Sequence, residues 1–98
     1  MKNIYLAQFT YAQQETPYIY FPYSVGTIWA YAQTHRDISD NYTLAKFLML
    51  TKPIDEVVSS LVDPYLIGFS IYVWNTEYSL QLAKAVKQRW PNCIIVFG

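Results

Sequence analysis

One short segment of the chain combines aromatic and small polar residues in a way that could bind a large flat ligand. Its polar members, whose side chains donate and accept hydrogen bonds, are Ser70, Asn75 and Thr76. Tyr72 and Trp74 add broad apolar faces, and Val73 lies between them. Rings of this kind could cover the face of a ligand while the hydroxyl and amide groups bind its polar edge.

A second aromatic segment, residues 8–23, leads up to Ser24 and contains Tyr18, Tyr20, Phe21 and Pro22. If the two segments face each other, they form the two walls of one crevice. The alternative is that these aromatic residues only pack between the loops or against an adjoining domain. The residue types alone favour neither interpretation.

Several familiar site chemistries lack the residues that they require. The sequence has neither Gly-x-Gly-x-x-Gly nor a Gly-Lys-Ser/Thr loop, so a dinucleotide or a nucleoside triphosphate would have no phosphate cradle. The single cysteine, Cys93, lies in an apolar run and can neither form an internal disulfide nor hold an iron-sulfur cluster. His35 stands alone, and Asp55 and Glu56 open a predicted helix, where carboxylates favour the positive end of the helix dipole. We therefore predict no catalytic residue and no metal ligand.

The elements that must position these residues alternate between strand and helix. Continuous apolar runs predict strands near residues 3–8, 42–49, 65–71 and 93–97, although Leu, Ala, Lys and Met leave a helical alternative for the second. Apolar residues at helical spacing predict helices from Ser24 to Thr34, from Pro53 to Leu61, and from Asn75 or Thr76 up to Pro91. Ser24 and either Asn75 or Thr76 are the predicted N-caps. Residues 35–41 are polar and are predicted to form a turn.

This alternation predicts an α/β fold, a Rossmann-like (flavodoxin-like) parallel sheet in the order 2-1-3-4 with helices on both faces. In such sheets ligands bind beyond the carboxyl ends of the strands, at the switch point between the first and third strands. The two aromatic segments lie on opposite sides of that point. Because the chain stops at Gly98 directly after a strand of the buried type, we expect residues 1–98 to be a partial domain, truncated before a fifth strand. The uncovered strand edge predicts possible homo-oligomers.

Composition restricts the partners. The chain is 53% hydrophobic and 14% charged with a formal net charge of zero, so part of its surface is expected to lie against another domain, a cofactor or a subunit. The sequence contains no stripe of basic residues that would indicate binding to nucleic acid. The sequence shows neither an apolar leader nor a run of about 18 apolar residues that could cross a membrane, so we expect a cytoplasmic protein.

Several motifs resemble one known family. The run Leu66-Ile67-Gly68-Phe69-Ser70, the pair Asn75-Thr76 before a long helix, and the strand from Cys93 to Gly98 look like the cobalamin-binding domain of radical S-adenosylmethionine (SAM) enzymes. The stretch from Pro22 to Gly26 is similar to the entry of the first helix in that family. The resemblance covers nearly the whole chain.

This resemblance implies a base-off corrinoid whose nucleotide tail lies along the carboxyl ends of the strands, with Ser70 and the Gly98 turn making room for it. The implied cofactor-binding residues are Pro22, Ser24, Ser70, Tyr72, Val73, Trp74, Asn75, Thr76 and Gly98. No Asp-x-His-x-x-Gly follows the first strand, which departs from the methionine-synthase type of domain and fits the radical branch.

The resemblance also implies what the chain lacks. S-adenosylmethionine and a 4Fe-4S cluster would belong to the catalytic barrel of the parent enzyme, which is absent here. The expected function is the amino-terminal corrinoid-binding module of a cobalamin-dependent radical SAM enzyme, a methyltransferase or an oxidative cyclase, inactive alone and packed against the rest of its own polypeptide. The alternative is a cofactor-free module for interaction or for shaping a substrate site.

Overall fold

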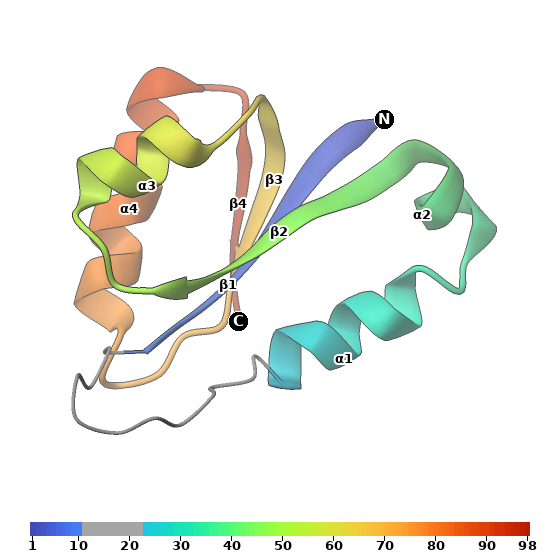
Figure 1. Ribbon diagram of the computed structural model, residues 1–98, viewed down its shortest axis with the longest axis horizontal. Coiled ribbons are helices and arrows are strands. Elements are labelled where there is room, and N and C mark those ends of the chain that lie inside the picture. The colour runs from blue at the N-terminus through green and yellow to red at the C-terminus, as the bar shows by residue number, and fades with distance from the viewer. Residues whose placement is uncertain (11–22) are drawn as a thin grey trace.

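The computed structural model describes residues 1–10 and 23–98 and contains a four-stranded parallel sheet (Figure 1). The strands are β1 (Lys2–Thr10), β2 (Tyr42–Leu50), β3 (Pro64–Phe69) and β4 (Ile94–Phe97). Their order is β2-β1-β3-β4, and every neighbouring pair is parallel. The predicted fold class and strand order are therefore confirmed. Residues 42–50 form a strand because pairing with β1 outweighs their helical propensity.

Helices lie on both faces of this sheet. They are α1 (Tyr23–Ala32), α2 (Arg36–Asn41), α3 (Ile54–Ser60) and α4 (Thr76–Arg89). Figure 1 shows α3 and α4 together on one face, with α1 and α2 on the other side of the sheet. The direction of the crossovers therefore reverses between β1 and β3, which places the switch point where the sequence predicted it.

Two local predictions are wrong, and a third is confirmed in its position. Residues 36–41 form the short helix α2, not a turn, since the backbone N–H groups of Ile38 and Ser39 both donate to the carbonyl of His35. Ser24 is not the N-cap of α1, because that helix already includes Tyr23. Asn75 is the N-cap of α4, as predicted, and its carbonyl accepts a hydrogen bond from the backbone N–H of Ser79, although its side chain makes no capping hydrogen bond. Thr76 is already inside the helix.

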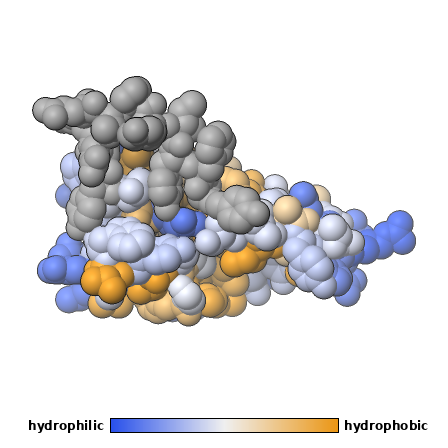
Figure 2. Space-filling view, turned by 90° about the horizontal axis from the view of Figure 1, so that it is seen from below, coloured by the Kyte–Doolittle hydropathy of each residue, from blue (hydrophilic) through white to orange (hydrophobic). Residues whose placement is uncertain are grey.

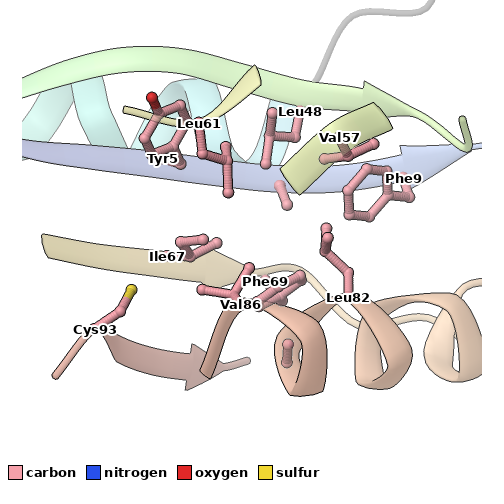
Figure 3. Close-up of a cluster of buried hydrophobic side chains, with 12 residues drawn as sticks. Tyr5, Phe9, Leu48, Val57, Leu61, Ile67, Phe69, Leu82, Val86 and Cys93 are labelled. Carbon is pink, nitrogen blue, oxygen red and sulfur yellow. The ribbon is translucent and has the colours of Figure 1, made fainter. Parts of the chain in front are cut away.

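The hydrophobic core fills the space between the sheet and the helices α3 and α4 (Figure 3). Alternate residues of β1 point into it, as the two-residue period of a strand requires: Tyr5, Ala7 and Phe9. Leu82 and Val86 of α4 meet them from the helical side and are fully buried. Burial of each large side chain contributes about 1.5–3 kcal/mol, so this layer holds β1, β3 and α4 in fixed relation.

A glycine permits close packing on the opposite face of the sheet. Gly68 of β3 pairs with Leu6 of β1. A Cβ atom at Gly68 would lie 3.0 Å from a methyl carbon of Leu6, which is tighter than ordinary contact. The absence of a side chain at Gly68 thus lets the side chain of Leu6 pack against β3.

At the amino end of the sheet, aromatic rings surround a lysine. The Lys2 ammonium lies 4.6 Å from the centre of the Tyr65 ring and 5.7 Å from that of Tyr42. These cation–π contacts link the amino ends of β1, β2 and β3, at the opposite end of the sheet from the predicted crevice. None of the helices in the described ranges is long and apolar enough to cross a membrane.

Candidate functional site

The carboxyl ends of three strands meet at the predicted switch point. The backbone N–H of Ser70 donates to the carbonyl of Ala7 over 2.8 Å, which is the last rung between β3 and the end of β1. On the other side, Gly98 donates to Phe69 over 2.9 Å and accepts from Ile71 over 2.8 Å. Ser70 and Gly98 therefore occupy the same edge of the sheet, as predicted.

The segment between β3 and α4 folds back on itself. The Thr76 hydroxyl donates to the carbonyl of Tyr72 over 2.7 Å, and the backbone N–H of Asn75 donates to the same carbonyl over 3.1 Å. The Asn75 side-chain oxygen accepts from the backbone N–H of Tyr72 over 2.9 Å. These bonds hold both main-chain polar groups of Tyr72, so the position of this residue is fixed independently of its side chain.

The hydroxyl groups of Tyr72 and Ser24 come together at this edge. The Tyr72 oxygen lies 3.3 Å from the Ser24 oxygen in the first turn of α1, and either group can donate. Hydrogen bonds from Ser24 and, second, from Ser70 favour the phenolate and lower the pKa of Tyr72 from its ordinary value of 10.0. The contact between Ser24 and Tyr72 thus joins the first turn of α1 to the loop after β3.

The same loop presents an apolar surface to solvent. The rings of Tyr72 and Trp74 stack with their centres 4.6 Å apart and their planes only 4° from parallel. Trp74 is 52% exposed and Val73 is 96% exposed. Figure 2, which views the molecule from below, shows hydrophobic and weakly polar side chains gathered on this side. An exposed stacked pair next to an exposed valine is suited to cover a flat apolar ligand.

The remaining predicted residues fall into two groups. Pro22 lies outside the described residues, as do Tyr18, Tyr20 and Phe21. Gly98 has open space around it, because a Cβ atom there would meet nothing within 4 Å.

The polar residues for which the sequence predicts no role in the site, His35, Asp55 and Glu56, lie elsewhere in the fold. His35 packs its ring against that of Tyr31, with centres 5.1 Å apart. Asp55 and Glu56 lie in the first turn of α3, as predicted. Within residues 1–10 and 23–98, no group of three or more histidine, cysteine, aspartate or glutamate side chains is placed to hold a metal ion.

The sequence placed Phe9 in one wall of the crevice but gave no sign that its backbone carbonyl takes part in the site. Its carbonyl accepts a hydrogen bond from the Asn75 amide over 3.1 Å. A backbone carbonyl is common to every residue and leaves no mark in the sequence, so only the fold could identify it. The available signal was an asparagine directly before a helix, which is typical both of caps and of loop hydrogen bonds.

Comparison with known proteins gives two relatives, while no protein-family model matches the chain. Over 81 residues the chain is 32% identical to the cobalamin-dependent radical SAM methyltransferase TokK of Streptomyces tokunonensis. Over 79 residues it is 27% identical to the 2-(S-pantetheinyl)-carbapenam-3-carboxylate methyltransferase of Streptantibioticus cattleyicolor. These matches cover 83% and 81% of this chain but only 12% of each relative. The resemblance indicated by the sequence is confirmed, and the chain corresponds to a small part of its relatives.

Proposed function

We propose, from the premise that the chain is homologous to a segment of a cobalamin-dependent radical SAM methyltransferase, that it is the corrinoid-binding module of such an enzyme. The observation that carries the proposal is 32% identity over 83% of the chain. Both relatives are methyltransferases by name, which favours methyl transfer over oxidative cyclisation as the reaction of the whole protein.

The residues at the switch point fit a corrinoid. A corrinoid has a flat macrocycle with an apolar face, polar amide arms and a nucleotide tail. The stacked pair of Tyr72 and Trp74, with Val73 beside it, offers apolar surface, and the hydroxyls of Ser24 and Ser70 offer hydrogen bonds at the mouth of the crevice. Ser70 is small and Gly98 has no side chain, so neither fills the edge of the sheet where a tail would lie.

In this proposal the chain binds and orients, while cobalamin supplies the methyl-transfer chemistry when bound. The hydroxyls of Ser24, Ser70 and Thr76 bind polar groups of the ligand. The rings of Tyr72 and Trp74 exclude water from its apolar face. S-adenosylmethionine and a 4Fe-4S cluster belong to a separate catalytic domain of the longer protein, against which this module packs, so the module alone is inactive. We also propose a cytoplasmic location.

Titration of hydroxocobalamin, followed by its visible spectrum, tests the proposal in the longer protein and in the 98-residue chain. The longer protein is expected to bind tightly. The short chain is expected to bind weakly, because a tight site encloses most of its ligand. Ser70→Leu should weaken binding by the longer protein at least about tenfold, equivalent to about 1.4 kcal/mol, because leucine fills the edge of the sheet.

Ser59→Leu is the matched control. Ser59 is exposed on α3, on the face of the sheet that carries the core, so its replacement should leave cobalamin binding unchanged. If the folded longer protein binds no cobalamin, the corrinoid proposal fails and the cofactor-free module remains. The low charge content of the chain, in which 14% of all residues are charged, supports that second function as an interaction module.

A further inference from the structure

Asn75 is a buried amide at the switch point whose hydrogen-bonding capacity is used within the protein. It is 1% exposed. Its nitrogen donates to the carbonyl of Phe9 and to that of Ser70, each over 3.1 Å, and its oxygen accepts from the backbone N–H of Tyr72. An amide nitrogen carries two hydrogens, so both donors are occupied. Asn75 therefore has no donor left for a ligand.

The two carbonyls bound by Asn75 belong to the strands that flank the crevice. Phe9 is near the end of β1, and Ser70 directly follows β3. The last backbone bond between these strands runs from Ser70 to Ala7. Beyond it the strands part, and a buried carbonyl without a partner costs about 1–3 kcal/mol. The Asn75 amide spans the gap and satisfies both carbonyls with one side chain.

We propose that Asn75 is a positioning residue that fixes the separation of β1 and β3 at the crevice and so places Tyr72 and Trp74. This role deepens the proposed function and rests on it. The amide nitrogen of Asn75 fixes the separation of the strands, because it donates to the carbonyls of Phe9 and Ser70. Its oxygen fixes the position of the Tyr72 backbone, because it accepts from the Tyr72 N–H. In this proposal the positioning role of Asn75 takes the place of the direct ligand contact that was expected for it from the sequence.

The state of the Tyr72 phenol reports on this role. Its hydroxyl contacts that of Ser24 only if the loop and the first turn of α1 are correctly spaced. Those hydrogen bonds lower the pKa of Tyr72. A loop that has lost its support should let this pKa rise toward its ordinary value of 10.0. A purely structural effect of Asn75 on overall stability would not move the pKa of one phenol.

The experiment is a pH titration of the 98-residue chain in which the tyrosine ring carbons that bear the hydroxyl are labelled with ¹³C and observed by NMR. Tyr72→Phe removes one resonance and so assigns it. In Asn75→Ala the Tyr72 resonance is expected to titrate at higher pH than in the wild type. Ser79→Ala is the matched control, since Ser79 is equally buried one turn further along α4. It should leave the Tyr72 titration unchanged.

Asn75→Asp keeps the proposal testable if Asn75→Ala does not fold. The new side chain retains the oxygen that accepts from Tyr72, but its ionised form cannot donate to the two carbonyls. The protonated form donates one bond, so the near-ultraviolet circular dichroism of the stacked rings should return toward that of the wild type as the pH falls. Loss of the signal without recovery at low pH would argue against the role.

Cobalamin titration of the longer protein separates the two hypotheses. If the wild type binds cobalamin and folded Asn75→Ala binds it about equally, with an unchanged Tyr72 titration, Asn75 is not a positioning residue. If the wild type binds no cobalamin while Asn75→Ala still shifts the Tyr72 titration, the corrinoid proposal fails and the role of Asn75 in shaping the crevice stands.

Discussion

Ser24 and Tyr72 are 48 residues apart in the sequence, yet their hydroxyl oxygens lie 3.3 Å apart. This contact joins the first turn of α1 to the loop after β3, and so it links the two sides of the switch point. Both residues are at least partly accessible to water, which competes for the same hydrogen bond. The contact is therefore expected to hold the start of α1 against the loop more than it stabilises the fold.

Replacement of Tyr72 by phenylalanine tests this expectation. We expect Tyr72→Phe to lower the free energy of unfolding by less than about 1 kcal/mol, because the hydrogen bond is exposed. The amide resonances of Ser24 and Val25 should nevertheless shift, since α1 loses its contact. Tyr65→Phe, at the opposite end of the sheet, serves as the control and should leave both resonances in place. Unchanged resonances in Tyr72→Phe would mean that the contact does not form in solution.

Ser79 offers a way to stabilise the chain. It is fully buried on the core face of α4, and its hydroxyl has no hydrogen-bond partner among the described residues. A buried unsatisfied hydroxyl is costly, and alanine favours the helix, so Ser79→Ala should raise the free energy of unfolding by about 1 kcal/mol. Urea unfolding measures the change. Ser59→Ala on the exposed side of α3 should have little effect, and a loss of stability in Ser79→Ala would reveal a hidden partner.

A buried thiol, Cys93, and a partly buried phenol, Tyr78, predict a loss of stability at alkaline pH. Burial raises the pKa of the Cys93 thiol above its ordinary 9.0, and burial followed by the nearby Glu56 carboxylate raises the pKa of Tyr78 above 10.0. The unfolded chain thus loses each proton before the folded chain does. Their stabilising contribution is complete below the ordinary values and declines as the pH rises from about 9 toward the raised values.

Replacement of Tyr78 by phenylalanine should reduce that decline above about pH 10, because the ring still packs against Phe9 but no longer ionises. Cys93→Ala should reduce it from about pH 9. The measurement is urea unfolding at closely spaced pH values, compared as slopes rather than as absolute stabilities. If both variants lose stability with pH as steeply as the wild type, other groups are responsible.

The outer strand β4 favours association with a second copy of the chain. It pairs with β3 on one side only, and Ile94, Val96 and Phe97 are each between 42% and 47% exposed. No charged residue interrupts residues 93–98, whereas β2, the other outer strand, carries Lys46. Charged residues on outer strands prevent pairing between sheets, so β4 lacks this protection.

We propose that two copies of the 98-residue chain pair through β4, and we expect light scattering to show dimers or larger species that increase with concentration. Val96→Lys should shift the chain to monomers, because two lysines would face each other across the pairing. Val62→Lys, at an exposed position before β3, is the control and should associate like the wild type. A monodisperse wild-type monomer at high concentration contradicts the proposal.

The sequence predicted most of the fold because its patterns are long. The apolar run before Ser70 and the helical spacing that places Leu82 and Val86 on one face each extend over a whole element. Residues 36–41 escaped prediction because a helix of less than two turns leaves almost no periodic signal. The contact of Ser24 with Tyr72 and the bond of Asn75 to Phe9 join residues 48 and 66 positions apart, which only the assembled sheet brings together.

The loop before α4 is held in place through main-chain atoms, so its exposed side chains are free to change. Asn75 and Thr76 bind the N–H and the carbonyl of Tyr72, groups that every residue except proline possesses. The side chains of Val73 and Trp74 lie outside this framework and are exposed. Substitutions at residues 73 and 74 can therefore change the exposed surface of the chain while the backbone keeps its path, provided that Asn75 and Thr76 are retained.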